Sequence, residues 1–181
     1  MSNVVYIATS LDGYIADQQG GLDWLHSLPN PEGNDFGFAA FVDSVDALVM
    51  GRTTFETVLS FGIDWPYSKP VFVLSSTLRE VPSELEGKVE IVNGPVKERL
   101  AELNARGFRR LYIDGGRTIQ SLMAEDLIDE LILTRIPVVL GGGVPLFGAL
   151  PKAQWYEHVT TQVHIDQMVM SHYRRRREAQ S

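Results

Sequence analysis

The sequence contains no cysteine, and this absence removes several kinds of chemistry at once. A chain without thiols forms no disulfides, has no thiolate nucleophile and offers no cysteine ligand to a metal. The first residues, "MSNVVYIATS", also lack the basic start and long apolar stretch of a secretory signal. Because disulfide-free chains are typical of reducing compartments, we expect a cytoplasmic protein.

Positive charge is scarce, with 16 Lys and Arg against 23 Asp and Glu and a formal net charge of -7. Nonspecific nucleic-acid binding needs many cationic contacts to phosphate, so this balance predicts no nucleic-acid partner. The one dense basic run, "RRRR" at 174–177, is either a solvated strand end or a nucleic-acid contact, and the acidic balance favours the first. An anionic ligand would need positive charge gathered locally.

Long hydrophobic runs and the common catalytic motifs are absent too. The most apolar segment, 131–150, is interrupted by Arg135, by prolines and by three consecutive glycines, whereas a membrane span needs about 20 apolar residues. G-x-G-x-x-G, the P-loop, H-E-x-x-H and G-x-S-x-G do not occur. His158, His164 and His172 have no metal-ligand spacing. We therefore expect no membrane association, no metal and no hydrolase site.

The pattern that is present is an alternation of strands and helices in a chain of 181 residues, a length suited to one core, so we expect a single domain over 1–181. Apolar spacing predicts a helix after Asn34, the expected N-cap, and a long strand over 129–140. Further strands are predicted around 4–9, 47–50, 70–76, 89–92, 110–114, 155–165 and 167–176, with helices at 53–62, 95–107 and 118–127. This order predicts an α/β layered fold with a mostly parallel sheet that closes on an antiparallel hairpin.

Three predicted strand ends carry similar residues, namely Gly51-Arg52-Thr53-Thr54, Ser75-Ser76-Thr77 and Gly115-Gly116-Arg117-Thr118. In open α/β sheets, ligands bind beyond the carboxyl ends of the strands. Glycine lets backbone N–H groups approach a phosphate, a helix start supplies free donors, and arginine adds a bidentate clamp. One Gly-Gly pair at a helix start also serves simple close packing, but three such ends favour a phosphate-bearing cofactor.

Together the segments "IATSLDGYIA", "VDALVMGRTTFE", "VFVLSST", "LYIDGGRTIQSL" and "LTRIPVVLGGGVPLF" resemble the dihydrofolate reductase superfamily. Within this superfamily, they are most similar to the branch that includes the reductase (C-terminal) domain of the bifunctional riboflavin-biosynthesis deaminase/reductase. The resemblance covers roughly Val4 to Tyr173. It implies a three-layer α/β/α fold, a homodimer and an NADPH-dependent oxidoreductase acting on a C=N or C=O group. The implied substrate is a pyrimidine- or pterin-like heterocycle, most like that of 5-amino-6-(5-phosphoribosylamino)uracil reductase, or a small carbonyl compound.

The resemblance also implies a role for individual residues at the cofactor. By this comparison Gly51, Arg52 and Thr53 hold the adenosine-side phosphates. Ser75 and Ser76 lie near the adenosine ribose and its 2′-phosphate. Gly115 and Gly116 form the turn beneath the pyrophosphate, Arg117 and Thr118 begin its helix, and the backbone of Ala8 faces the nicotinamide carboxamide. An arginine with hydroxyls suits a 2′-phosphate, so we expect NADPH rather than NADH.

Two carboxylates, Asp12 and Asp35, are candidates for proton transfer, since reduction of C=N or C=O needs a proton source. The structural alternative for Asp12 is a residue of an Asp-Gly turn, and for Asp35 a residue in the first turn of a helix. Trp24 either covers the nicotinamide or substrate or anchors its own loop. The chain lacks the Asp-Asp-Pro stretch of the riboflavin branch and the Pro-Trp entry of the folate enzymes. The substrate of neither branch can therefore be assigned directly to this chain. A dinucleotide-binding or sensing protein that kept the fold without the chemistry is the alternative.

The segment "GGGVPLF" at 141–147 is typical of the riboflavin-like branch. Its glycines either line the cofactor cleft or let a partner chain approach closely. The apolar run "IPVVL" at 136–140 and the closing hairpin are the expected dimer interface.

Overall fold

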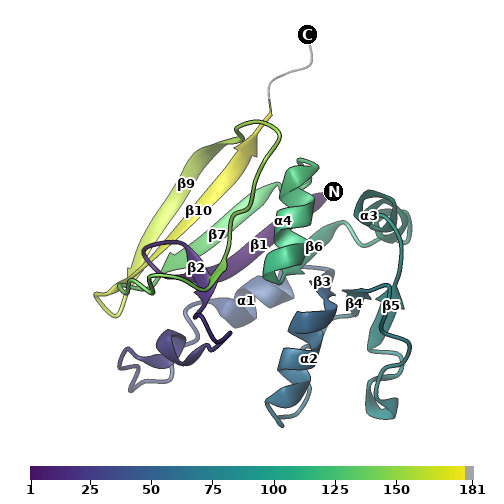
Figure 1. Ribbon diagram of the computed structural model, residues 1–181, viewed down its shortest axis with the longest axis horizontal. Coiled ribbons are helices and arrows are strands. Elements are labelled where there is room, and N and C mark those ends of the chain that lie inside the picture. The colour runs from purple at the N-terminus through teal and green to yellow at the C-terminus, as the bar shows by residue number, and fades with distance from the viewer. Residues whose placement is uncertain (178–181) are drawn as a thin grey trace.

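An eight-stranded sheet forms the centre of the protein in a computed structural model, which describes residues 1–177 (Figure 1). The strand order is β5-β4-β3-β6-β1-β7-β10-β9. The strands are β1 (Ser2–Thr9), β3 (Ala47–Gly51), β4 (Val71–Leu74), β5 (Val89–Val92), β6 (Arg110–Asp114), β7 (Glu130–Arg135), β9 (Trp155–His164) and β10 (Met168–Arg176). The six strands from β5 to β7 pair in parallel, and β10 and β9 follow in antiparallel pairing. The predicted fold class, with its C-terminal antiparallel hairpin, is confirmed.

Helices cover both faces of the sheet because its central strands bury side chains on both sides. Val4 and Leu48 face α1 (Phe38–Asp43) and α2 (Arg52–Ser60), whereas Val5 and Val49 face α3 (Val96–Ala105) and α4 (Gly116–Ala124). All four of these residues are fully buried. The period of two along each strand thus divides the core into two apolar clusters and gives the three-layer architecture.

The helix α1 begins later than the sequence pattern predicts, and Asn34 is not its N-cap. Its N-cap is Gly37, in the left-handed region at φ 88°. The cap donors are satisfied by Asp35, whose carboxylate accepts the N–H groups of Gly37 at 3.0 Å and Ala39 at 2.9 Å. Asn34 instead accepts the N–H of Phe36 at 2.7 Å. A turn stabilised by two short polar side chains therefore precedes the helix.

The strand predicted over 129–140 ends at Arg135, so that prediction is too long. Ile136 still donates its N–H to the carbonyl of Thr9, but the chain beyond it leaves the sheet towards the first loop. There β2 (Tyr14–Ala16) and β8 (Val144–Pro145) form a small second, antiparallel sheet. Pro137 removes one backbone donor and the three glycines favour an irregular path, which explains the early end.

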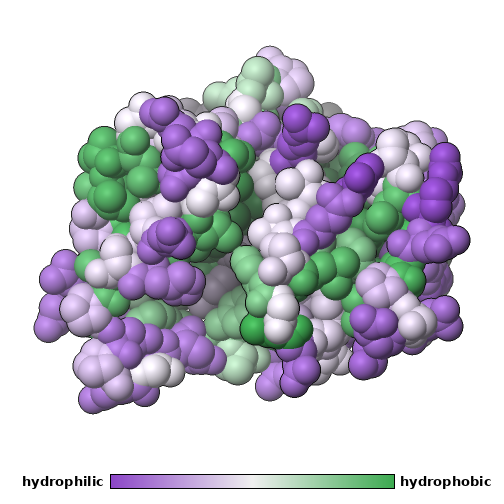
Figure 2. All heavy atoms as spheres, turned by 60° about the horizontal axis from the view of Figure 1, so that its bottom comes forward, coloured by the Kyte–Doolittle hydropathy of each residue, from purple (hydrophilic) through white to green (hydrophobic). Residues whose placement is uncertain are grey.

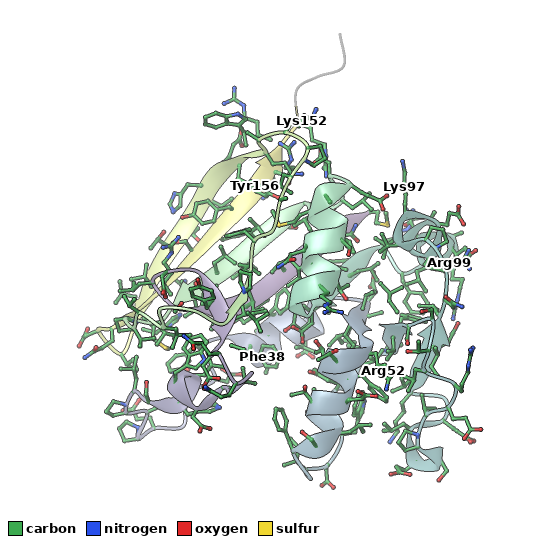
Figure 3. All side chains as sticks on the ribbon, viewed as in Figure 1. Phe38, Arg52, Lys97, Arg99, Lys152 and Tyr156 are labelled. Atoms are coloured by element: carbon green, nitrogen blue, oxygen red, sulfur yellow. The ribbon has the colours of Figure 1, made fainter. Side chains whose placement is uncertain are left out.

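Two short 3₁₀ helices, η1 (Asp23–His26) and η2 (Ser83–Leu85), complete the elements. The arginine run lies at the end of β10, where Arg175 pairs with Asp126 at 2.7 Å and Arg177 with Asp129 at 2.6 Å. This end of the hairpin, near Lys152 and Tyr156, lies at the opposite side of the molecule from Arg52 (Figure 3). Within 1–177, every helix is too short or too polar to cross a bilayer.

Candidate functional site

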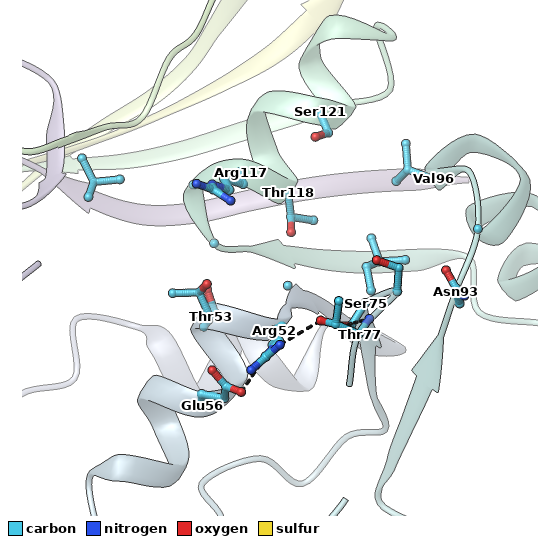
Figure 4. Close-up of a pocket in the computed structure, with 18 residues that line it drawn as sticks. Arg52, Thr53, Glu56, Ser75, Thr77, Asn93, Val96, Arg117, Thr118 and Ser121 are labelled. Carbon is cyan, nitrogen blue, oxygen red and sulfur yellow. Dashed lines mark hydrogen bonds and ion pairs between the residues drawn. The ribbon is translucent and has the colours of Figure 1, made fainter. Parts of the chain in front are cut away.

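A cleft with a volume of about 930 Å³ lies beyond the carboxyl ends of the strands, between the starts of α2 and α4 (Figure 4). All the predicted cofactor-binding residues except Ala8 line it: Gly51, Arg52, Thr53, Ser75, Ser76, Gly115, Gly116, Arg117 and Thr118. Figure 2, which brings the lower side of Figure 1 forward, shows a hollow near the middle of that face. The three strand ends singled out in the sequence therefore meet at one site.

The starts of α2 and α4 leave backbone donors free in this cleft, because neither helix has a side-chain cap. Gly51 and Gly115 allow the two starts to come close together. A Cβ on Gly51 would lie 2.9 Å from the hydroxyl of Thr118, and one on Gly115 would collide with the hydroxyl of Thr54. Gly115 also has φ 96°, a left-handed conformation that disfavours other residues. Two positive helix ends thus point into one space that suits an anion.

Arg52 is held over the cleft by two polar contacts (Figure 4). Its Nε donates to Oε1 of Glu56 at 2.7 Å, and its NH1 group donates to the hydroxyl of Thr77 at 2.8 Å. The ion pair is half-exposed on both sides, so it adds little stability and can exchange its partner for a phosphate. Arg117 enters from α4 and has no ion pair within residues 1–177. The positive charge that an acidic protein needs at an anion site is gathered here.

Ser75 shapes the turn after β4, since its hydroxyl accepts the N–H groups of Thr77 at 3.2 Å and Leu78 at 2.9 Å. Sequence reasoning missed the part of the cleft beyond β5, where Asn93, Gly94 and the α3 residue Val96 line the wall. The same strand-end pattern could have found it, because "NGP" follows the predicted strand. Glu56 and Ser121 were also missed, whereas Thr54 and Thr77, which belong to the strand-end motifs, line the cleft as expected.

Ala8 lies outside the cleft, near the end of β1, opposite Thr134 of β7. Asp12 lies in the turn after β1, and three donors occupy its carboxylate. These are the Ser10 hydroxyl at 2.6 Å and the N–H groups of Leu140 at 3.0 Å and Gly141 at 2.8 Å. The Ser10 hydrogen bond is the largest cause that lowers the Asp12 pKa to about 2. An ionised and fully bonded carboxylate ties two loops together and is poorly suited to give up a proton.

Asp35 caps α1, and its exposed carboxylate has a lowered pKa, first because of the N–H of Ala39 and then that of Gly37. The structure thus places Asp35 apart from the cleft lining, where it acts as the helix-start residue that the sequence analysis gave as an alternative.

Trp24 is buried in a small cluster with Ile136 and Met168, so it anchors its loop. The glycines at 141–143 pack against the first loop of the same chain, where a Cβ on Gly143 would collide with the carbonyl of Ala16.

Asp114 is a residue next to the cleft lining that the sequence analysis did not single out. It ends β6 directly before the Gly115–Gly116 turn, opposite Met50, and its Oδ1 accepts the N–H of Gly115 at 2.9 Å. Burial raises the pKa of this carboxyl to about 6, although the Gly115 hydrogen bond lowers it. A carboxyl group that changes protonation near neutral pH can act as an acid or a base, and the strand-end position puts it beside the cleft.

Within residues 1–177, no group of three or more His, Cys, Asp or Glu is arranged to hold a metal ion. The cleft offers backbone N–H groups, hydroxyls and guanidinium groups, which are donors for phosphate oxygens. Its glycines leave space where a side chain would collide with the opposite wall. These features fit a phosphate-bearing dinucleotide.

Comparison with known proteins agrees with this geometry. Residues 4–170 match the RibD C-terminal domain family. A Shewanella sp. PV-4 protein, provisionally named a riboflavin biosynthesis protein, is 56% identical over 98% of this chain and 100% of its own, with a TM-score of 0.95. The Thermotoga maritima diaminohydroxyphosphoribosylaminopyrimidine deaminase/5-amino-6-(5-phosphoribosylamino)uracil reductase is 15% identical, with a TM-score of 0.73 over 96% of this chain and 56% of that one.

Dihydrofolate reductase from Enterococcus faecalis, in complex with NADP(H) and RAB-propyl, is 21% identical over 96% of both chains, with a TM-score of 0.66. At these low identities the last two similarities establish the fold alone, whereas the family match covers nearly the whole sequence. The chain therefore belongs to the family of RibD C-terminal domains and has the fold of dihydrofolate reductase.

Proposed function

We propose that this protein is an NADPH-dependent oxidoreductase that reduces a C=N or C=O group of a pyrimidine- or pterin-like heterocycle. 5-Amino-6-(5-phosphoribosylamino)uracil, the reductase substrate in the name of the Thermotoga maritima relative, belongs to this class. The observation that carries the proposal is the meeting of three strand-end turns and two arginines in one cleft. The complex of Enterococcus faecalis dihydrofolate reductase with NADP(H) supports the same cofactor class.

In this proposal the dinucleotide lies in one direction along the cleft. Arg52 and the β4 turn at Ser75–Thr77 would hold the adenosine side and its 2′-phosphate. The starts of α2 and α4, with Gly115 and Gly116, would hold the pyrophosphate. The cleft continues to Val144 of β8, towards the end of β1, where the backbone of Ala8 would meet the nicotinamide. When bound, the nicotinamide supplies the hydride, and the residues of the chain orient it and exclude water.

The proton that completes the reduction needs a group that is protonated in part near neutral pH. Asp114 fits this requirement better than Asp12, because burial raises its pKa to about 6. Asp12 then serves as a positioning residue, since its carboxylate fixes the loop at Leu140 and Gly141.

The first experiment is a titration of the purified protein with NADPH and with NADH, followed by quenching of tryptophan emission. We expect saturable binding of NADPH at micromolar concentration and weaker binding of NADH. Arg52→Ala should weaken NADPH binding by about ten-fold or more, because a charge-assisted contact to phosphate is lost. Arg174→Ala is the matched control, since this exposed arginine lies on β10 in the arginine run. Absence of binding by either nucleotide would remove the proposal.

The alternative is a dinucleotide-binding or sensing protein without reductase chemistry, and the same cleft would serve it. Asp12→Asn and Asp114→Asn variants separate the two. A reductase loses turnover in at least one of them while it still binds NADPH, whereas a binding protein keeps its full nucleotide response and shows no NADPH oxidation with any heterocycle tested.

A further inference from the structure

The turn between β5 and α3 contains the one Asn-Gly pair of the sequence, Asn93-Gly94. Both residues are exposed, and both line the wall of the dinucleotide cleft (Figure 4). The carbonyl of Val92, the residue before Asn93, accepts the N–H of Ser75 at 3.1 Å. The pair therefore lies directly beside the turn after β4, to which the proposed function assigns the adenosine side of the dinucleotide.

An asparagine followed by glycine can lose its side-chain amide without an enzyme, because glycine has no side chain to hinder its own backbone nitrogen. After loss of its proton, the backbone nitrogen of Gly94 would attack Cγ of Asn93. A bond forms between this nitrogen and Cγ, the Cγ–Nδ2 bond breaks, and ammonia leaves with the proton that the nitrogen gave up. One water molecule then opens the cyclic imide, which leaves either aspartate or isoaspartate at position 93.

The structure leaves both reacting groups of this pair free. Gly94 lies between β5 and α3, so no strand or helix uses its backbone N–H. Within residues 1–177 this N–H has no acceptor, and the side-chain amide of Asn93 has no hydrogen-bond partner. The amide can therefore rotate towards the nitrogen without loss of a hydrogen bond.

The other asparagines of the chain are Asn3, Asn30, Asn34 and Asn104, and each is hindered in its own way. Asn3 is buried, and its amide donates to the carbonyl of Leu127 at 2.8 Å. Asn30 precedes a proline, which has no N–H to attack with. Asn34 is followed by the side chain of an aspartate, and Asn104 lies within α3, where the helix holds the backbone. Asn93 is therefore the asparagine most open to this reaction.

The turn also requires its glycine. Gly94 has φ 129°, a conformation that residues with a Cβ rarely adopt. A Cβ at this position would lie only 3.2 Å from Nε of Arg99. This Nε is buried and has no hydrogen-bond partner in the described part of the chain, and the Arg99 side chain is held by an ion pair with Glu102 at 2.8 Å. A glycine after Asn93 is thus built into the wall of the cleft.

Either product adds a negative charge to a cleft whose donors suit phosphate. The new carboxylate would lie beside the turn where Thr77 accepts a hydrogen bond from Arg52 at 2.8 Å. At this distance it would repel a phosphate and compete with it for the guanidinium group. Isoaspartate would also lengthen the backbone by one methylene group directly before α3. A dinucleotide in the cleft would in turn cover the exposed pair and restrict its rotation.

We propose that Asn93 deamidates spontaneously in the folded protein, that a bound dinucleotide slows this reaction, and that the product binds the dinucleotide more weakly. The modification site itself stands on the geometry of the turn, whereas its coupling to the cofactor rests on the proposed function.

The first test is incubation of the full chain at about pH 8 and 37 °C, followed by trypsin digestion and mass spectrometry. Cleavage after Lys88 and Lys97 releases the peptide 89–97. We expect this peptide to gain about one mass unit, as separable aspartate and isoaspartate forms, at least about ten-fold faster than peptides with the other asparagines. Asn93→Gln is the control, because glutamine must close a larger ring and should stay intact. Equal rates at all asparagines would overturn the inference.

The second test measures the coupling to the cofactor. Saturating NADPH should slow the conversion of peptide 89–97 by about three-fold or more. Asn93→Asp, which reproduces one product, should weaken NADPH binding by about 3- to 10-fold. Asn34→Asp is the matched control, since it adds the same charge outside the cleft lining and should leave the affinity unchanged.

Conversion at the same rate with and without bound NADPH, or equal NADPH affinity of Asn93→Asp and the wild-type protein, would overturn the coupling. Failure of the wild-type protein to bind NADPH is a separate outcome. It removes the proposed function and the coupling with it, while the peptide analysis without nucleotide still decides whether Asn93 is modified.

Discussion

Asp12 lies in the turn after β1 and Asp114 ends the neighbouring strand β6, yet their surroundings shift the pKa values of their carboxyl groups in opposite directions. Hydrogen bonds from the Ser10 hydroxyl and two backbone N–H groups lower the pKa of Asp12 to about 2. Burial raises that of Asp114 to about 6. Pairs of titratable groups whose pKa values are driven apart are typical of active sites, where one group stays ionised and the other exchanges a proton. Residue type alone does not distinguish the two, because both are aspartates near the carboxyl end of a strand.

The raised pKa of Asp114 predicts a pH dependence of stability. Its pKa is higher in the folded protein than the ordinary value of 3.8, so its contribution is fully present below about pH 4 and is lost as the pH rises through 6. Asp114→Asn removes this loss, and above pH 7 the variant should be more stable than wild type by about 2–3 kcal/mol. Urea unfolding at several pH values between 4 and 8 measures the difference. Parallel curves for the two proteins would contradict the prediction.

Gly115 offers a second prediction at the level of one residue. Gly115→Ala puts a methyl group against the hydroxyl of Thr54 and forces φ 96° on a residue with a Cβ. We expect the left-handed backbone to cost about 1 kcal/mol in the free energy of unfolding and NADPH affinity to fall by more than ten-fold, since the two helix starts must separate. Chemical denaturation and NADPH titration measure the two effects.

Gly107→Ala is the control for this change. Gly107 has a similar φ of 101° at the end of α3, but a Cβ there meets no atom within 4 Å. Gly107→Ala should lose less stability than Gly115→Ala, because only its backbone conformation is strained, and it should keep its NADPH affinity. If both variants bind NADPH equally well, the close approach of α2 and α4 is not needed for the cofactor.

At the scale of elements, Asp12 joins the loop after β1 to the glycine loop before β8. Asp12→Ala removes the acceptors of the Leu140 and Gly141 N–H groups, which lie more than a hundred residues away in sequence. Hydrogen exchange at these two amides should become faster by about ten-fold or more, while the amides of β6 keep their protection. Turnover should fall together with this protection. Unchanged exchange at both amides would show that the small β2–β8 sheet holds the loops without Asp12.

Local patterns in the sequence predict the elements and the cleft well, because strand period, helix ends and glycine turns act over a few residues. Gly62 and Gly107 end their helices as expected, and the three strand-end motifs meet in the cleft. What the sequence does not predict depends on distant partners. The burial of Asp114, the start of α1 at Phe38 and the end of β7 at Arg135 are set by packing and pairing across the fold. A smaller cavity, of about 220 Å³, is lined by residues of four strands, β1, β7, β9 and β10, and by the turn at Phe36 and Gly37, so no local pattern could locate it.

At the scale of the whole molecule, the C-terminal hairpin exposes apolar side chains. Val163 is 62% exposed and its partner in the antiparallel pair, Val169, is 38% exposed. We propose that a second copy of the chain covers this surface. Val163→Lys should shift the protein towards monomer in sedimentation experiments, because burying a lysine at an interface is unfavourable.

The control is Ile63→Lys, since Ile63 is 63% exposed but lies just after α2, away from the hairpin. It should leave the sedimentation coefficient of the wild-type protein unchanged. A wild-type protein that sediments as a monomer at all concentrations would contradict the expected homodimer.

The cofactor cleft is built largely from backbone, and this has a consequence for how the family can evolve. Where N–H groups at helix starts are the donors, substitution of a nearby side chain does not remove them. Only a few positions, such as Gly115, forbid a Cβ outright. Most side chains around the cleft can therefore change while these backbone donors stay in place, and the fold itself is shared at 15% to 21% identity.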